Sequence, residues 1–280
     1  MSSDPSTNPN PVCYEALASS YEAIYGQIDA KETVRQWWQL LVDAKLVVDP
    51  PGALRMVDIG CGPGWQVEAW RELGFTVVGL DSSPTLLASA RERLADKDKQ
   101  PNIYLADILD PTSLPVLRPF DLAVSHFNFL NLFDQKQREE VFRSVARLVR
   151  PGGLWITDFS EPRAIPASVE ETIHLPDGIL ERKGQFNSQL GCYDQRWEGS
   201  VLSCVERFWF GHRGTVPSLA LKTGWHLCLR KAWHPYTSEA AWHEPGEGDE
   251  VFVDVYQRIE GKKDELDHNP ARVGALSRAA

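Results

Sequence analysis

Three glycines lie close together in the segment VDIGCGPGW, residues 57–65. Gly60, Gly62 and Gly64 follow a short apolar run, and glycine removes the Cβ atom from any ligand that the backbone approaches closely. Such turns hold adenosine-bearing molecules, among them nicotinamide dinucleotides, flavins, nucleoside triphosphates and S-adenosylmethionine. The turn by itself does not choose among them.

Two of these ligands are disfavoured by the residues around the glycines. A dinucleotide fingerprint, G-x-G-x-x-G, would place its third glycine at position 65, where this chain has Trp65. A phosphate-binding P-loop would end in Gly-Lys-Ser or Gly-Lys-Thr, and the segment does not. Hydride transfer and nucleoside triphosphate chemistry at this turn therefore become less favoured alternatives.

The elements that would position the turn alternate between strands and helices. Apolar runs predict strands at 54–60, 75–81, 102–107, 120–127 and 154–160, and helical spacing predicts helices at 14–26, 31–47, 65–74, 84–97 and 137–149. Strands separated by helices of this length form right-handed crossovers, so the predicted fold class is α/β, a mainly parallel sheet with helices on both faces.

The pattern changes after residue 160. Short strand-like runs joined by turns predict an antiparallel β insertion over 162–212, and a helix at 215–223 then precedes two strands, 225–233 and 249–259, that pair as an antiparallel hairpin. The expected organisation is an N-terminal tail and helical lid (1–45), a cofactor-binding core (46–161), the insertion (162–212), completion of the core sheet (213–260) and a flexible tail (261–280).

Four motifs occur in order, each at a strand end: VDIGCGPG, VVGLD with Asp81, LADI with Asp107, and RLVRPGGLWITDF. Together they resemble a class I S-adenosylmethionine-dependent methyltransferase of the small-molecule type. The resemblance implies a Rossmann-like, doubly wound, seven-stranded sheet of order 3-2-1-4-5-7-6 with strand 7 antiparallel. It also implies S-adenosylmethionine as the cofactor and S-adenosylhomocysteine as the product.

The resemblance assigns a role to each motif. Asp58 would reach the methionine ammonium through water, Asp81 would accept hydrogen bonds from the ribose hydroxyls, and Asp107 with Ile108 would hold the adenine edge. Asp107 could instead cap a turn. The full predicted set of cofactor residues is Tyr14, Tyr21, Asp58, Gly60, Cys61, Gly62, Gly64, Asp81, Ser82, Asp107, Ile108, Ser125 and His126, with no metal ligand.

The acceptor is expected beyond the carboxyl ends of the fourth and fifth strands. His126 is the candidate general base or orienting residue, because an unperturbed imidazole can accept a proton at neutral pH. An equal alternative is that His126 only packs over the adenine or caps the next helix. Tyr14, Tyr21 and Tyr25 fall on one helical face, as expected either for a lid or for any buried amphipathic helix.

The insertion is predicted to cover the acceptor. It offers aromatic and arginine side chains that suit a flat or anionic small molecule, and that would equally suit a dimer interface. The predicted substrate residues are Tyr25, Asn128, Asn131, Tyr193, Arg196, Arg207 and His212. Trp197 and Phe208 are further possible contacts.

Composition sets limits on the partners. A formal net charge of −10 disfavours nucleic acid as a partner, and no apolar segment is long enough for a membrane span. The five cysteines are scattered and odd in number, which argues against a disulfide framework or a zinc site and favours a reducing cytoplasm. A monomer and a homodimer both remain open.

The functional prediction is therefore a cytoplasmic methyltransferase that moves the methyl group of S-adenosylmethionine to an N or O atom of a small metabolite, with specialised metabolism as a candidate setting. The alternatives are a C-methyltransferase acting on an activated small molecule, and a methyltransferase-like binding or scaffold protein without turnover.

Overall fold

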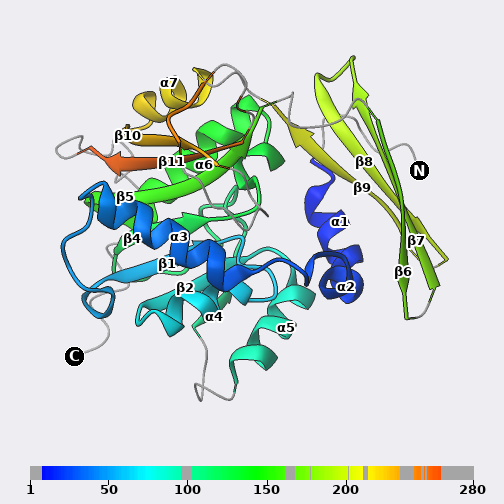
Figure 1. Ribbon diagram of the computed structural model, residues 1–280, viewed down its shortest axis with the longest axis horizontal. Helices are drawn as coiled ribbons and strands as arrows, with labels where there is room; N and C mark the ends of the chain where they lie inside the picture. The colour runs from blue at the N-terminus through cyan, green and yellow to red at the C-terminus, as the bar shows by residue number, and fades with distance from the viewer. Residues whose placement is uncertain are drawn as a thin grey trace.

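A twisted seven-stranded sheet forms the centre of the computed structural model, which describes residues 8–95, 102–161, 168–176, 178–200, 202–210, 214–233, 243–246, 249 and 251–259 (Figure 1). Its order is β10-β11-β5-β4-β1-β2-β3. The strands are β1 (Arg55–Ile59), β2 (Thr76–Asp81), β3 (Ile103–Leu105), β4 (Phe120–Ser125), β5 (Val149–Ser160), β10 (Trp225–Ala232) and β11 (Val251–Arg258). Strands β1 to β5 pair in parallel, whereas β11 is antiparallel to both β5 and β10. The predicted fold class and strand order are confirmed.

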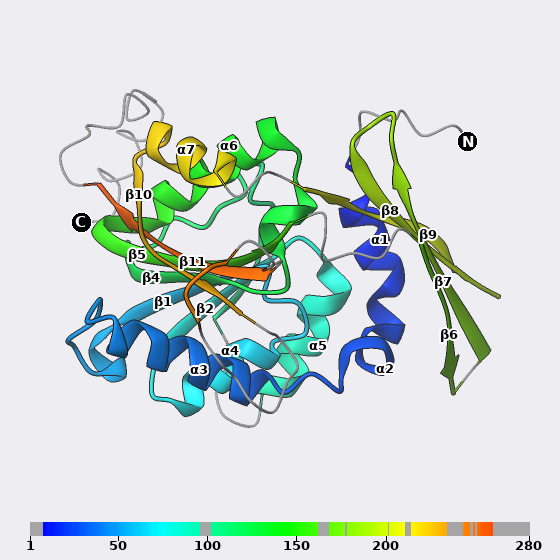
Figure 2. The same ribbon diagram turned by 45° about the horizontal axis from the view of Figure 1, so that its top comes forward.

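Helices cover both faces of this sheet (Figure 2). On one face, α3 (Ala30–Asp43), α4 (Trp65–Glu72) and α5 (Pro84–Leu94) bury a core that includes Trp37 and Trp70. On the other face, α6 (Gln135–Leu148) and α7 (Thr215–Lys222) cover a core that includes Phe142 of α6, Trp155 and Trp225. Short 3₁₀ turns lie at Pro51–Ala53 and Phe129–Leu132. Among the described helices, none is long and apolar enough to cross a membrane.

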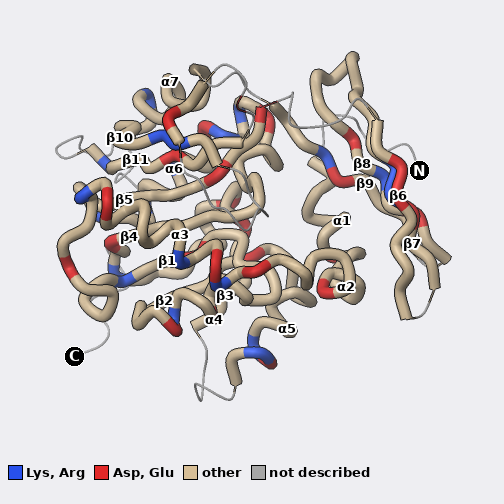
Figure 3. Tube along the Cα trace, viewed as in Figure 1, with Lys and Arg blue, Asp and Glu red and all other residues tan. Residues whose placement is uncertain are grey.

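The segment predicted as a β insertion contains a second, four-stranded antiparallel sheet. Its strands are β6 (Ser168–Leu175), β7 (Gly178–Asn187), β8 (Cys192–Gly199) and β9 (Ser203–Trp209), paired in that order. One face carries residues 193, 195 and 197 of β8 and residues 204, 206 and 208 of β9, because the register pairs Tyr193 with Phe208 and Trp197 with Cys204. On this sheet, acidic and basic segments lie next to one another (Figure 3).

The N-terminal segment lies between the two sheets (Figures 1 and 2). Where one helix was predicted, the chain forms α1 (Asn10–Leu17), a 3₁₀ turn (Ala18–Ser20) and α2 (Tyr21–Tyr25). Buried side chains of α1 and α2 form a small core with Leu180 and Trp197 of the inserted sheet. The Asn10 side chain accepts a hydrogen bond from the Arg207 backbone N–H at 2.6 Å and donates one to its carbonyl at 2.8 Å. Helix α1 is therefore fixed to β9.

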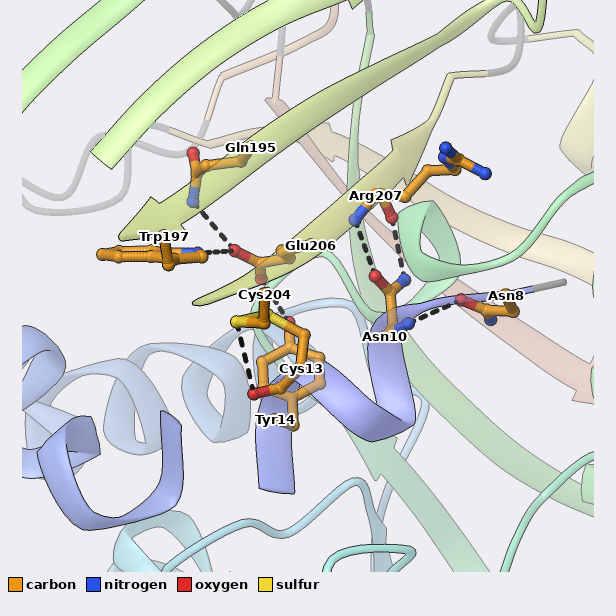
Figure 4. The surroundings of a disulfide bond; sticks show 9 residues. All are labelled: Asn8, Asn10, Cys13, Tyr14, Gln195, Trp197, Cys204, Glu206 and Arg207. Atoms are coloured by element: carbon orange, nitrogen blue, oxygen red, sulfur yellow. Dashed lines mark hydrogen bonds between the residues drawn. A yellow bond between two sulfur atoms is a disulfide. The ribbon is translucent and has the colours of Figure 1, made fainter. Parts of the chain in front are cut away.

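A disulfide joins Cys13 of α1 to Cys204 of β9 (Figure 4). The expectation that the cysteines form no disulfide was therefore wrong for this pair, while Cys61, Cys192 and Cys228 are free thiols. The two bonded cysteines are 191 residues apart in the sequence. They meet only because the insertion folds back over the N-terminal helices, which a local spacing pattern does not reveal.

Candidate active site

A cavity of about 310 Å³ opens where the glycine turn leaves β1. Gly62 has a φ of +50° and a Cβ there would meet nothing within 4 Å, so its backbone faces open space. Its N–H donates to Asp81 Oδ2 at 2.8 Å, which ties the turn to the end of β2. At Gly60, a Cβ would lie 2.9 Å from the ring of Phe129. The backbone conformation favours glycine at both positions, since Gly60 has a φ of +76°, and at Gly60 a close neighbour excludes a Cβ as well.

Nine of the thirteen predicted cofactor residues line this first cavity: Tyr14, Tyr21, Gly60, Gly62, Asp81, Ser82, Asp107, Ile108 and His126. The other four lie elsewhere. Gly64 packs against α5, where a Cβ would be 3.1 Å from that of Ala90, and Cys61 is buried beneath Gly79. The Ser125 hydroxyl points into the core, where it donates to Thr157 Oγ1 at 2.7 Å.

Asp58 is the fourth residue outside the lining, and its carboxylate is unusual. The side chain is 1% exposed, and Oδ2 has no hydrogen-bond partner among the described residues. Burial, and to a smaller extent the nearby Asp81 carboxylate, raises the pKa of Asp58 to about 8. A buried acid without a positive partner is destabilised as an anion, so this position favours a cationic ligand group.

Asp107 caps a turn, which is one of the two roles that the sequence left open, and its role toward the adenine stays a prediction. Its Oδ1 accepts a hydrogen bond from the Leu109 N–H at 2.9 Å, which is the turn-capping arrangement. It also lines the cavity beside Ile108. The turn cap fixes the backbone of this loop at the edge of the cavity.

His126 lies in an apolar, aromatic environment. Its ring stacks on Trp37 at a centroid distance of 4.0 Å, and its Nε2 accepts a hydrogen bond from the Trp70 indole at 3.3 Å. Burial lowers the pKa of His126 to about 3, so the imidazole is neutral and weakly basic at pH 7. This environment supports the packing alternative, and we do not assign His126 as the general base.

A second cavity of about 410 Å³ adjoins the first, since Tyr14, Tyr21 and Phe127 line both. It lies between α1 and α2, the carboxyl end of β5 and the inserted sheet. Eight of its eighteen lining residues are aromatic. Of the predicted substrate residues, this cavity brings together Tyr25, Asn128, Asn131 and Tyr193.

Asp158 of β5 is an acidic residue of this second cavity that was not singled out in the sequence. It is 3% exposed, and its Oδ1 accepts a hydrogen bond from the Asn128 N–H at 2.9 Å. Phe127 and Asn128 both have positive φ values, 62° and 55°, which strain non-glycine residues and are common at functional sites. Burial raises the pKa of Asp158 to about 7, opposed by backbone hydrogen bonds from this strained turn. A carboxylate with that pKa suits proton transfer near neutral pH.

Glu206 of β9 is the other acidic residue of the second cavity that was not predicted (Figure 4). It is 2% exposed. The Tyr14 hydroxyl donates to Oε1 at 2.5 Å, and the Gln195 amide and Trp197 indole donate to Oε2 at 2.8 and 3.3 Å. Burial is the main cause that raises the pKa of Glu206 above its usual value.

The remaining predicted substrate residues do not reach this cavity. Arg196 is exposed on the opposite face of β8, one position away from the inward residues Gln195 and Trp197. Arg207 also faces outward, and its guanidinium pairs with Asp194 at 2.6 Å. His212 lies outside the described residues. Because side chains alternate along a strand, an error of one position transfers a residue to the other face of the sheet.

Asn131 acts as a brace in this structure. It is 1% exposed, its Oδ1 accepts from the Ser160 N–H at 2.8 Å, and its amide donates to the carbonyls of Ser160 and Trp209 at 2.9 and 3.1 Å. Asn128 accepts from the Ser160 hydroxyl at 2.7 Å. These contacts hold the loop after β4 against β5 and β9.

The first cavity fits S-adenosylmethionine. It combines a glycine turn that approaches open space, an acid at the end of β2 and a buried, unpartnered carboxylate oxygen nearby that suits a positively charged ligand. With the seven-stranded sheet and its antiparallel β11, these features are those of class I methyltransferases, the class that takes its methyl group from S-adenosylmethionine.

The comparison with known proteins agrees. Residues 56–153 match the family model described as a methyltransferase domain, and this part of the chain is such a domain. A demethylmenaquinone methyltransferase of Renibacterium salmoninarum is 29% identical over 182 residues, 64% of this chain and 71% of that protein. Two further curated relatives, both named as methyltransferases, match over about half of their own length.

Solved structures share the fold over most of the chain. The CcbJ methyltransferase of Streptomyces caelestis superposes with a TM-score of 0.70 at 18% identity, covering 89% of this chain and 99% of that one. CalS10, an amino pentose methyltransferase of Micromonospora echinaspora, superposes with a TM-score of 0.61 at 17% identity, covering 86% and 95%. The solved structures show that the fold is shared, and the methyltransferase-domain match and the cavity together support an enzyme that uses S-adenosylmethionine.

Proposed function

We propose that this enzyme transfers the methyl group of S-adenosylmethionine to an N or O atom of a small molecule bound in the second cavity. The observation that carries the proposal is that two adjoining cavities share Tyr14, Tyr21 and Phe127 as common walls. One cavity is bordered by the glycine turn and Asp81, and the other by Asp158. A donor and an acceptor bound side by side is the arrangement that a direct displacement requires.

The chain would hold the donor through a few defined contacts. Asp81 would accept hydrogen bonds from the ribose hydroxyls, Asp107 and Ile108 would border the adenine, and Asp58 would face the methionine ammonium through water. When bound, S-adenosylmethionine supplies an electrophilic methyl group on a sulfonium that leaves as a neutral thioether. Tyr14 and Tyr21, which line both cavities, would cover the boundary between donor and acceptor and exclude water from it.

On the acceptor side, Asp158 replaces His126 as the proposed base. Its pKa of about 7 leaves a large fraction ionised at neutral pH, whereas the pKa of about 3 makes His126 a poor proton acceptor. The strained turn at Phe127 and Asn128 would keep the carboxylate fixed at the wall of the cavity.

The names of the related proteins point to different acceptors. One relative is named for demethylmenaquinone, another for the acyl group of malonyl-[acyl-carrier protein], and one structural neighbour for an amino pentose. These names support small molecules as the acceptor class. They differ on the atom that is methylated, since one relative is named an O-methyltransferase and one structural neighbour a sugar N-methyltransferase. The choice has to come from the residues of the second cavity.

Methyl transfer from labelled S-adenosylmethionine into separate pools of amines, phenols and carboxylic acids tests the proposal. We expect label in one pool, and tighter S-adenosylhomocysteine binding by the wild type than by Asp81→Ala. Arg196→Gln, an exposed change on the outer face of β8, is the control and should leave both measurements unaltered. Binding without transfer to any pool would favour the scaffold alternative, and no binding at high micromolar concentration would refute the proposal.

A further inference from the structure

Two buried carboxylates of the second cavity, Asp158 and Glu206, have no ion-pair partner in the part of the chain that the structure describes. Asp158 is held by backbone N–H groups, and Glu206 accepts hydrogen bonds from three uncharged groups. Arg182 is a cation in the lining of this cavity. It pairs with Glu171 at 2.5 Å, its Nε has no hydrogen-bond partner among the described residues, and its charge lowers the pKa of Glu206 by less than the three hydrogen bonds to that carboxyl do. The lining therefore holds two carboxylates against one cation, and that cation already pairs with Glu171.

The hydrogen bonds around Glu206 favour its ionised form. The indole of Trp197 and the amide of Gln195 are donors, and both point at Oε2, so that oxygen carries no proton. The Tyr14 hydroxyl completes the set at Oε1. Three donors to one buried carboxylate offset part of the cost of its burial, but a positive ligand would offset more.

The rest of the lining also suits a cation. Tyrosine, phenylalanine and tryptophan rings attract ammonium groups through their faces, and aromatic walls are a common way to recognise them. The Tyr193 hydroxyl adds a polar contact: it is buried in a side chain that is 2% exposed and has no hydrogen-bond partner among the described residues. It lies over the backbone of Gly184, where a Cβ would collide with it.

We propose that the acceptor is an amine that enters the second cavity as an ammonium ion and is recognised there by Glu206. This inference rests on the proposed function and narrows its N or O atom to nitrogen. Glu206 is a recognition residue, while Asp158 on the other wall receives the proton. Tyr193 offers its unpartnered hydroxyl to a further polar group of the same ligand.

The step balances without another reactant. An ammonium ion gives one proton to the Asp158 carboxylate, and the freed nitrogen lone pair forms the new N–C bond. The C–S bond breaks with its electron pair on sulfur, so the positive charge moves from sulfur to the methylated nitrogen. The proton on Asp158 is then released to solvent.

Calorimetric titration of matched probes tests the inference independently of turnover. Benzylamine, benzyl alcohol and benzoate, and cyclohexylamine with cyclohexanol, are each titrated into the protein with and without S-adenosylhomocysteine. We expect each amine to bind at least about tenfold more tightly than its alcohol, because a buried carboxylate contributes a charge-assisted contact to the ammonium alone. Comparable or tighter binding of the alcohols or of benzoate, or no binding of any probe at millimolar concentration, would overturn the inference.

Variants then locate the source of the preference. Glu206→Gln should reduce the amine preference to near unity, whereas Glu198→Gln, an exposed carboxylate on the outer face of the same sheet, should retain it. An unchanged affinity for S-adenosylhomocysteine shows that the variant is folded. If Glu206→Gln kept the full preference for amines over alcohols, Glu206 would not be the residue that recognises the ammonium ion.

Methyl transfer to the same probes separates this inference from the proposed function. Methyl transfer to alcohols, without a preference for amines, would overturn this inference but would still support the proposed function. An amine preference with no transfer to any acceptor would support amine recognition and count against the proposed function.

Discussion

We predict that the buried carboxylate of Asp58 makes the affinity for the cofactor depend on pH. Its pKa of about 8 means that the unliganded protein holds this group mostly protonated at pH 7. The ammonium of S-adenosylmethionine or S-adenosylhomocysteine interacts favourably with the ionised form. Below pH 8, binding of the ligand therefore requires Asp58 to release a proton, and the affinity rises with pH until Asp58 is fully ionised.

The size of the effect follows from the titration. A carboxyl group with that pKa is ionised in roughly 1% of molecules at pH 6, about 9% at pH 7 and about 90% at pH 9. If only the ionised form binds tightly, the contribution of Asp58 to affinity grows about ninetyfold between pH 6 and pH 9.

Isothermal titration calorimetry of S-adenosylhomocysteine, at constant ionic strength from pH 6 to pH 9, measures this directly. The ligand's own amino group also titrates, so the informative quantity is the ratio of the Kd of Asp58→Asn to that of the wild type, in which the ligand's titration cancels. We predict a ratio that rises about tenfold per unit at low pH and levels off above pH 8. A ratio that does not change with pH would refute the role of Asp58.

Three further outcomes are expected. Asp158→Asn should lower kcat by about 10²- to 10⁴-fold, the range for loss of a general base. The wild-type kcat should rise through pH 7 as Asp158 is deprotonated, and this rise should be absent in the variant. A variant with the wild-type pH profile would exclude Asp158 as the base. Gly60→Ala should lower the free energy of unfolding by about 1–3 kcal/mol in urea titrations, because its Cβ would meet a ring at 2.9 Å, whereas Gly52→Ala, with its nearest neighbour at 3.8 Å, should show no such loss. Thiol titration of the denatured protein should count three free thiols before reduction and five after it, and five thiols before reduction would contradict the disulfide. Cys204→Ser should lower the free energy of unfolding by about 2–4 kcal/mol, because the bond to Cys13 is lost.

The core fold could be predicted because its signals are local. Apolar runs, the spacing of helical faces and the acids near the ends of β2 and β3 all lie within short segments. The strand order came from the family that the motifs resemble. The N-terminal lid was less predictable. The tyrosines share one helical face in the sequence, yet the chain breaks at Ala18–Ser20, and the rings of Tyr21 and Tyr25 still meet at 4.8 Å. Packing against the inserted sheet determines that geometry.

The acceptor cavity could be predicted only in part because its residues meet across long distances. The inward face of the inserted sheet carries Arg182, Gln195 and Glu206 along with aromatic residues, so hydrophobic alternation does not distinguish it from the outward face. Because of this ambiguity, Arg196 was predicted to contact the substrate although it lies on the outward face. Asp158 lies in a segment that was expected to meet the acceptor, but its burial, and therefore its raised pKa, follows from contacts with the turn after β4.

The structure of the protein with bound S-adenosylhomocysteine and benzylamine tests the central claim most directly. The ribose hydroxyls should lie on Asp81, the adenine should lie beside Asp107 and Ile108, and the thioether sulfur should face the second cavity with the amine between Asp158 and Glu206. A nucleoside bound elsewhere, or a sulfur atom separated by protein from the second cavity, would contradict the account.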